Sequence, residues 1–320
     1  VLLKNAIKPN LLQTSEGTPC FVHGGSSGAA GLGVSSVVSD KIALGLAEYV
    51  IGETAFGSDI GAEKFFDIKC RTSGIKPDVA VVVCSMRALK MHSGDFEVAM
   101  GKPLPREAFR ENLSGVERGL SNLEKHVENL DVFGIPIVLC INRFKEDTDK
   151  EVNAVKRRAL TLGVTAAVVS TVAQEGGEGG LELARAVIDA VKKKHGFRFL
   201  YPLDMPIKDK VRRVARTIYG AKEVIFSDLA NSKAAQFKKL KLDNLPVCID
   251  KTHLSLSHNP KRKGRPHNFR FPIEDLIPYR GAGYIQAYTL NASKLLPGLP
   301  KVPRGTKIDI DEEGKIVGLF

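Results

Sequence analysis

Short, almost continuously apolar runs alternate with longer amphipathic segments between residues 76 and 194. The runs are VAVVVCS at 79–85, IPIVLCIN at 135–142 and VTAAVVST at 164–171. Such runs are typical of strands that are buried on both faces of a parallel sheet. Apolar residues recur at helical spacing in the segments 110–130, 148–162 and 181–194. The pattern predicts an α/β fold with a doubly wound, mostly parallel sheet.

The alternation stops at GFRFLYPLDMP, residues 196–206, where we predict a domain boundary. Beyond it, residues 207–219 and 228–242 have helical spacing, and short strands with many turn residues follow. The closing TKIDIDEEGKIVGLF alternates around an Asp-Glu-Glu-Gly turn and predicts a hairpin. We therefore predict a partial α/β domain over 1–200 and a smaller C-terminal α+β domain over 201–320.

With 320 residues, of which 43% are hydrophobic, and a mean hydropathy of −0.07, the chain is long enough to bury a large core. No apolar run is long enough to span a membrane, and VLLKNAIKPNLLQTSEG lacks the features of a signal peptide, so an intracellular location is expected. The five cysteines are odd in number and far apart. They predict reduced thiols, with no disulfide framework and no zinc site.

The net charge of +11 and the isoelectric point near 9.4 favour polyanionic partners. These include nucleic acid, nucleotide phosphates and poly-carboxylate substrates, and charge alone leaves the choice open. Most of the basic groups suit solvated helix faces. HNPKRKGRPHN, residues 258–268, is the basic segment in which Pro and Gly bound a loop whose side chains could converge on a ligand.

In a doubly wound sheet, ligands bind beyond the carboxyl ends of the strands. The segments that follow the three predicted strands are 85–94, 142–149 and 171–180. The first carries Arg87 and Lys90, two fixed cations that are candidates for binding a nucleotide or phosphate. The second carries Asn142 and Arg143 directly after a buried strand, where ligand-binding groups are expected. The third, EGGEGG at 175–180, would let a ligand approach the backbone closely.

Two further segments have candidate chemistry. HGGSSGAAGLGVSS, residues 23–36, could wrap backbone amides around a phosphate, with Gly24 and Gly25 nearest the preceding strand, or could be a packing loop. It is neither a Gly-x-x-x-x-Gly-Lys-Ser/Thr loop nor a GxGxxG motif. Carboxylates at Glu53 and Asp59, in a segment with several glycines, could bind a cation or cap a helix.

Longer motifs carry a resemblance to a known family. They include AFGSDIGAEKFFDIKCR, MRALKMHSG, INRFKEDT, NLPVCIDKTHLSLSHNP and IDIDEEGKIVGLF. In this order and over essentially the whole chain, they resemble the C-terminal part of formate–tetrahydrofolate ligases, and they look closer to the ligase domain of eukaryotic C1-tetrahydrofolate synthases than to bacterial ligases. The resemblance implies a sheet of the P-loop NTPase type, and a nucleotide- or folate-binding role for residues 1–200.

The resemblance also implies an activity. The family uses ATP with Mg²⁺ to phosphorylate formate, and tetrahydrofolate captures the formyl phosphate to give 10-formyltetrahydrofolate in one-carbon metabolism. A monovalent cation activates the reaction, and Glu53 and Asp59 are our candidates to bind it. The implied partners are formate, tetrahydrofolate, ATP and further copies of the chain, with no membrane and no nucleic acid. The implied location is cytoplasmic or mitochondrial.

For folate binding, the resemblance singles out Phe144 of INRFKEDT, with Asn142 and Arg143 beside it. The family's other aromatic positions differ here, because Ser27 replaces a phenylalanine and Val172 or Ala173 replaces a tryptophan. The 320 residues also contain no Gly-x-x-x-x-Gly-Lys-Ser/Thr motif, so no catalytic lysine is identified. We therefore expect no autonomous turnover. The alternative is a non-catalytic paralogue that binds folate or assembles with another subunit.

Overall fold

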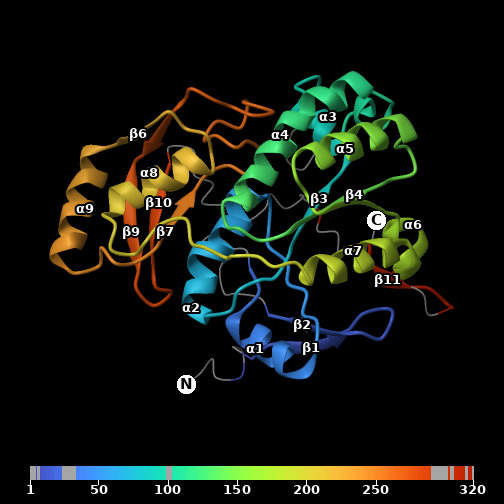
Figure 1. Ribbon diagram of the computed structural model, residues 1–320, viewed down its shortest axis with the longest axis horizontal. Coiled ribbons are helices and arrows are strands. Elements are labelled where there is room, and N and C mark those ends of the chain that lie inside the picture. The colour runs from blue at the N-terminus through green and yellow to red at the C-terminus, as the bar shows by residue number, and fades with distance from the viewer. Residues whose placement is uncertain are drawn as a thin grey trace.

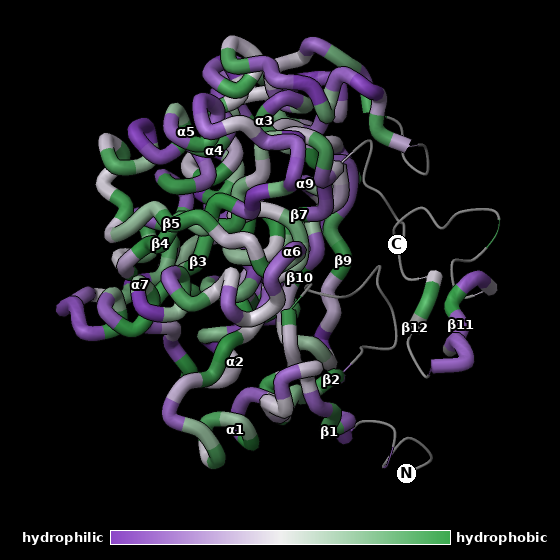
Figure 2. Tube along the Cα trace, turned by 90° about the vertical axis from the view of Figure 1, so that its right-hand side faces the viewer, coloured by the Kyte–Doolittle hydropathy of each residue, from purple (hydrophilic) through white to green (hydrophobic). Residues whose placement is uncertain are grey.

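A parallel three-stranded sheet forms the centre of the first half of the chain. The computed structural model describes residues 5, 8–23, 34–98, 103–289, 302, 306–313 and 316–318. The strands are β3 (Ala80–Cys84), β4 (Ile137–Asn142) and β5 (Ala166–Ser170), in the order β3-β4-β5. Figure 2 shows them side by side as largely hydrophobic segments. The α/β fold with a parallel sheet is thereby confirmed.

Helices cover both faces of this sheet. The helices that follow β3 and β4 are α3 (Met86–His92), α4 (Leu113–Asp131) and α5 (Asp149–Thr161). α6 (Val172–Glu175) and α7 (Leu181–Val191) follow β5 and lie on the opposite side from α4 and α5 (Figure 1). α4 and α5 share one face and α7 packs against β4 and β5 on the other, so helices lie on both faces of the parallel sheet.

The longest helix, α4, is fixed by its cap and by one apolar stripe. Asn112 caps its N-terminus, because the Asn112 side chain accepts a hydrogen bond from Gly115 N at 2.8 Å. Val116, Leu120 and Leu123 recur at helical spacing and are buried in the main core. A methyl group on Gly119 would lie 2.1 Å from the carbonyl oxygen of Leu89, so glycine allows α3 to pack closely.

The N-terminal part has little regular structure of its own. The hairpin β1 (Asn10–Gln13) with β2 (Pro19–Val22) precedes α1 (Val37–Leu46). π-Helical turns at Ser58–Ala62 and Phe65–Cys70 and the short α2 (Arg71–Ser73) lead into β3. Single turns of 3-10 helix lie at Arg106–Phe109 and Gly176–Gly180.

The described segment 207–288 has two smaller sheets and two helices, seen on the left of Figure 1. Its elements are α8 (Ile207–Thr217), β6 (Glu223–Phe226), α9 (Asp228–Lys239), β7 (Val247–Asp250), β8 (Arg270–Ile273), β9 (Asp275–Tyr279) and β10 (Tyr284–Tyr288). β6 pairs with β8, and β10 lies between β7 and β9. β11 (Asp309–Ile310) and β12 (Ile316–Val317) form the predicted antiparallel hairpin. The domain boundary near residue 200 stays a prediction.

Two expectations from composition can be compared with the structure. All five cysteines are free, and Cys70, Cys84, Cys140 and Cys248 are buried. No helix among the described residues is long and apolar enough to cross a bilayer. The expectation that all three strands are buried on both faces is wrong for β3, because Val81 and Val83 are 42% and 65% exposed.

A buried polar stripe links the helical segment 58–73 to the second half of the chain. Asp67 accepts a hydrogen bond from Leu200 N at 3.1 Å and forms an ion pair with Arg71 at 3.2 Å. The same guanidinium donates to the carbonyl oxygen of Tyr201. Burial raises the pKa of Asp67 to about 6 and, together with the charge of Asp67, holds the pKa of Glu63 well above its ordinary value.

Buried Asp67 contributes a pH dependence of stability that Asp67→Asn should reduce. Because the folded state favours protonated Asp67, its contribution to the free energy of unfolding is complete below the ordinary pKa of 3.8 and is lost as the pH rises through about 6. Urea unfolding of wild type and variant between these pH values measures the difference. The exposed Asp189 provides the control, as Asp189→Asn should leave the pH profile unchanged. Parallel profiles for wild type and Asp67→Asn would contradict this assignment.

Candidate functional site

The segments after β4 and β5 are held together at the carboxyl edge of the sheet. Asn142 pairs in register with Ser170. Arg143 N donates to the carbonyl oxygen of Ser170 at 3.0 Å, and the Gln174 side chain donates to the carbonyl oxygen of Arg143 at 3.1 Å. The segments after β4 and β5 are therefore joined at the edge predicted to bind ligands.

Phe144 is positioned by a tight turn immediately after β4. Its backbone N–H donates to the Asp147 carboxylate at 2.9 Å. Asp147 is buried, and burial raises its pKa above the ordinary value. Arg143 forms an ion pair with Asp149 at 2.8 Å on the other side of the turn. The turn thus presents the half-buried Phe144 ring at the sheet edge.

Arg87, from the first turn of α3, stacks on this ring. Its guanidinium carbon lies 3.9 Å from the centre of Phe144 and 4.7 Å from the centre of Phe109. One terminal nitrogen donates to Glu146 at 2.8 Å, while Nε has no hydrogen-bond partner among the described residues. A cation and an aromatic ring are therefore in contact where the ends of β3 and β4 meet, an arrangement suited to a planar, anionic ligand.

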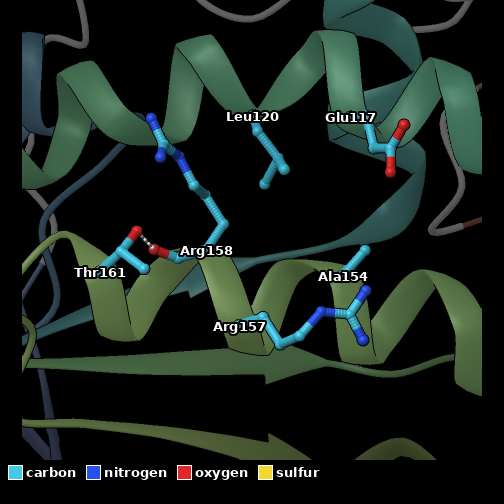
Figure 3. Close-up of a pocket in the computed structure, with 6 residues that line it drawn as sticks. All are labelled: Glu117, Leu120, Ala154, Arg157, Arg158 and Thr161. Carbon is cyan, nitrogen blue, oxygen red and sulfur yellow. Dashed lines mark hydrogen bonds between the residues drawn. The ribbon is translucent and has the colours of Figure 1, made fainter.

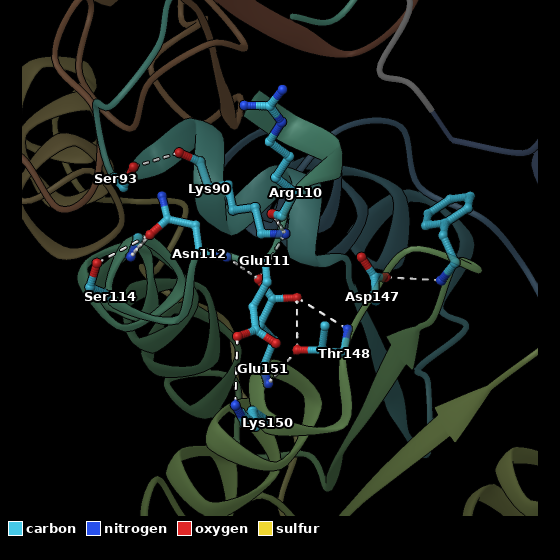
Figure 4. A network of polar contacts seen from close by, with 12 residues as sticks. Lys90, Ser93, Arg110, Glu111, Asn112, Ser114, Asp147, Thr148, Lys150 and Glu151 are labelled. Atoms are coloured by element: carbon cyan, nitrogen blue, oxygen red, sulfur yellow. Dashed lines mark hydrogen bonds and ion pairs between the residues drawn. The ribbon is translucent and has the colours of Figure 1, made fainter. Parts of the chain in front are cut away.

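Lys90, predicted to bind phosphate, is engaged inside the protein. It is 1% exposed, and its Nζ lies 2.8 Å from Glu151 and 2.7 Å from the carbonyl oxygen of Arg110 (Figure 4). Burial alone would raise the pKa of Glu151, but hydrogen bonds from Asn112 N, Lys90 and Thr148 N hold it below the ordinary value. The pair ties α3, the segment before α4 and the start of α5 together.

Val172, predicted to face the folate ring, begins α6 and is 48% exposed. The glycine turn that follows contacts the first hairpin, because Gly177 N donates to the Glu16 carboxylate at 2.7 Å. A methyl group on Gly177 would lie 2.2 Å from that carboxylate oxygen. A side chain at this position would displace the flexible end of Glu16, and the contact brings the β1–β2 turn to the sheet edge.

Asp59 and Glu53, predicted to bind a cation, have different surroundings. Asp59 is buried, with Lys251 Nζ at 2.5 Å and His126 Nδ1 at 3.9 Å, whereas Glu53 is exposed. Burial opposes ionisation of Asp59, but the charges of Lys251 and His126 and the hydrogen bonds to the carboxylate together outweigh it and hold the pKa below the ordinary value. The Lys251 ammonium occupies the place beside Asp59 that a cation would take. The residues present do not fit a bound cation there.

The basic loop at 258–268 docks on α4. Arg265 makes two hydrogen bonds of 2.7 Å to Glu128, and Gly264 N donates to His92 Nδ1 at 3.3 Å. Burial lowers the pKa of His92 to about 4, so the imidazole is neutral at neutral pH. Part of the loop's charge is thus already neutralised within the protein.

Some candidates lie elsewhere. Gly24, Gly25 and Ser27 lie outside the described residues. Within the described part of the chain, no group of three or more His, Cys, Asp or Glu side chains could hold a metal ion. A hollow of about 280 Å³ between α4 and α5 is lined by Glu117, Leu120, Ala154, Arg157, Arg158 and Thr161, none of which was predicted as a site residue (Figure 3).

Sequence reasoning missed several partners of the predicted residues. Phe109 and Glu146 hold Arg87, and Lys251 neutralises Asp59. Lys251 belongs to the motif NLPVCIDKTHLSLSHNP, which carried part of the family resemblance. The motif indicated that this segment resembles the family, but it did not indicate that Lys251 pairs with Asp59.

The parallel sheet with helices on both faces places the chain in the α/β class, and a cation and an aromatic ring lie at its carboxyl edge. A sequence model of the family described as formate–tetrahydrofolate ligase matches residues 1–320. The chain belongs to the formate–tetrahydrofolate ligase family.

Its relatives are longer proteins. The formate–tetrahydrofolate ligase of Desulforamulus reducens is 48% identical over the whole chain, which covers 56% of that protein. The ligase of Chloroflexus aurantiacus is 45% identical, again with 56% covered. The human cytoplasmic C-1-tetrahydrofolate synthase is 47% identical, with 34% covered. The chain thus spans about half the length of the ligases it matches.

Removing Lys90 should destabilise the protein strongly. Lys90→Met leaves the Glu151 carboxylate buried without its cation, and we expect a loss of about 3 to 5 kcal/mol in the free energy of unfolding. Lys150→Met, which breaks the exposed pair with Glu111, is the control and should cost about 0 to 1 kcal/mol. Urea unfolding at pH 7 measures both. Equal losses would show that Lys90 is not a structural anchor.

Proposed function

We propose that this chain contributes the tetrahydrofolate-binding part of a formate–tetrahydrofolate ligase. Such an enzyme uses ATP with Mg²⁺ to convert formate to formyl phosphate, which then formylates tetrahydrofolate to 10-formyltetrahydrofolate. Two findings support the proposal: the family match over residues 1–320, and the contact of Arg87 with Phe144 at the carboxyl edge of the sheet. The second carries the assignment of the site.

In this proposal, Phe144 offers a ring face to the pterin, and Arg87 supplies positive charge beside it. The Arg87 guanidinium covers one face of Phe144, so the pterin takes the other face or displaces the guanidinium. Asn142 and Arg143 lie beside Phe144 in sequence and contribute polar groups at the end of β4. Val172 replaces an aromatic partner with an aliphatic side chain, which would weaken ring stacking by about 1 to 3 kcal/mol.

Arg87 has the charge to interact with the formyl phosphate intermediate. Its Nε is buried without a partner, and its second terminal nitrogen is not used in the ion pair with Glu146. A guanidinium can therefore stabilise the negative charge on the departing phosphate as the formyl group is transferred to tetrahydrofolate. Lys90 is assigned no chemical step, because its ammonium is engaged with Glu151.

The proposal includes a cellular setting. A homo-oligomer in the cytoplasm or mitochondrion suits the family, and one relative is named as cytoplasmic. The second candidate function is a non-catalytic module for folate binding or subunit assembly. It is favoured by the exposed valines of β3, which leave part of the sheet uncovered.

The first test is turnover by the chain alone. With formate, MgATP and tetrahydrofolate, we expect no 10-formyltetrahydrofolate, because the 320 residues contain no Gly-x-x-x-x-Gly-Lys-Ser/Thr motif to hold the phosphates. A chromatographic assay for the product measures this. Appreciable product from the purified chain would contradict the expectation.

The second test is folate binding. Phe144→Ala should weaken binding of tetrahydrofolate polyglutamate, measured by calorimetry, about tenfold to a hundredfold through loss of ring stacking. Phe199→Ala is a matched control, because Phe199 stacks on Arg71 at the same 3.9 Å but away from the sheet edge. Binding that is unchanged by Phe144→Ala, or absent in the wild type, would rule out this site. If calorimetry detects no binding heat with tetrahydrofolate and none with ATP, the result favours the assembly module.

A further inference from the structure

Two buried carboxyl groups lie about one turn apart on the helical segment 58–73. Glu63 and Asp67 are both 0% exposed. They are four residues apart, so their side chains are neighbours on one side of the segment. Two carboxyl groups this close in the interior cannot both carry a full negative charge without strong repulsion.

The hydrogen-bond partners of the two groups differ. Asp67 Oδ1 accepts from Leu200 N at 3.1 Å and from Arg71 at 3.2 Å, whereas Asp67 Oδ2 has no donor among the described residues. Neither oxygen of Glu63 has an N–H donor within the described part of the chain. The hydrogen bond that Glu63 makes is to the Asp67 carboxyl group itself. Carboxylates only accept hydrogen bonds, so this contact requires a proton on one of the two groups.

The surroundings assign that proton to Glu63. Asp67 faces the Arg71 guanidinium, which stabilises a negative charge on it. Glu63 has no such partner, because the neighbouring Lys64 bonds to the Cys248 thiol. Burial and the charge of Asp67 hold the pKa of Glu63 well above its ordinary value, whereas burial raises the pKa of Asp67 to about 6. At neutral pH the pair therefore retains one proton, on Glu63.

The other titratable and charged groups around the pair come from every element packed against it. They are Asp59, Lys64 and Arg71 on the same segment, His126 on α4, Tyr201 before α8, Tyr219 after it, Cys248 and Asp250 on β7, and Lys251. Burial is the main cause that raises the pKa of both phenols well above the ordinary value, and it raises the pKa of Cys248 to about 11. Burial lowers the pKa of His126, and Asp59 is paired with Lys251 at 2.5 Å. Asp67 therefore stays the acceptor for the Glu63 proton.

The pair connects this helical segment to the part of the chain that leads into α8. Asp67 holds the Leu200 amide, and Arg71, which is paired with Asp67, donates to the carbonyl oxygen of Tyr201. A buried Asp67 Oδ2 without a donor would be costly, so the Glu63 proton completes the bonding that keeps this connection in place. If Glu63 ionised, two adjacent carboxylates would repel each other and the connection would loosen.

We propose that Glu63 stays protonated at neutral pH and donates its proton to Asp67, so that the two side chains form a one-proton latch between segment 58–73 and Leu200. The latch is sensitive to pH. It is closed while Glu63 keeps its proton and opens when Glu63 ionises in alkaline solution. The inference goes beyond the proposed function, since it needs neither folate binding nor turnover.

Infrared spectroscopy of the folded chain at pH 7 detects the proton directly, because a protonated carboxyl group has a carbonyl stretch that carboxylates lack. We expect Glu63→Gln to remove such a band. Glu182→Gln is the matched control at an exposed position on α7 and should leave the band in place. Identical spectra of wild type and Glu63→Gln in this region would overturn the proposal.

Urea unfolding at pH 7 and pH 8 measures the same proton by linkage. In the unfolded chain, Glu63 ionises above its ordinary pKa of 4.5, so unfolding releases the proton and becomes more favourable as the pH rises. The unfolding constant of wild type relative to Glu63→Gln should therefore increase about tenfold per pH unit. A ratio that is the same at both pH values contradicts the proposal. A Glu63→Gln chain that does not fold would show that a charge is needed there and would also overturn it.

Glu63→Met tests the hydrogen bond of the latch. Methionine is similar in length to glutamine but cannot donate, so it leaves Asp67 Oδ2 without a partner. Amide exchange of Leu200 at pH 7 should be at least about tenfold faster in Glu63→Met than in Glu63→Gln, which should keep the wild-type rate. Unfolding of the Glu63→Met chain alone would be the same result in a stronger form. Equal exchange in the two variants would show that Glu63 does not hold Asp67, and the latch would have to be abandoned.

Discussion

The buried ion pair between Lys90 and Glu151 is the interaction on which the candidate site depends. It joins the helix after β3 to the helix after β4, and Lys90 also binds the carbonyl oxygen of Arg110. Leaving either charge unpaired in the interior would be costly, so both helices are held in a fixed relation. Arg87, one turn before Lys90 on α3, is thereby kept within reach of Phe144.

That constraint explains why two cations of similar sequence context have different roles. Lys90 points into the protein and is fully engaged, while Arg87 remains partly exposed between two aromatic rings. A guanidinium suits this position because it stacks on a ring and still donates hydrogen bonds in its plane. The proposed folate site therefore depends on Arg87 and Phe144 as a pair. The buried ion pair of Lys90 with Glu151 holds the helix that carries Arg87 in place.

The uncovered face of β3 connects the fold to the proposed function. A doubly wound sheet places its ligand between strands that progress in opposite directions, and here β3 is the last strand on that side among the described residues. Of the residues proposed to bind folate, Arg87 follows β3, Phe144 follows β4 and Val172 follows β5.

Periodicity alone determined the central strands, the helices between them and the edge on which candidate residues lie, because burial requires apolar residues at regular spacing. Longer motifs determined the family. Only the tertiary structure decided that Lys90 pairs with Glu151, that Arg87 stacks on Phe144 and that Val83 is exposed. A lysine in an amphipathic helix has the same local pattern whether it faces water or a carboxylate. An apolar run likewise has the same pattern whether or not a neighbouring element covers it, since contacts between distant segments depend on how the elements pack.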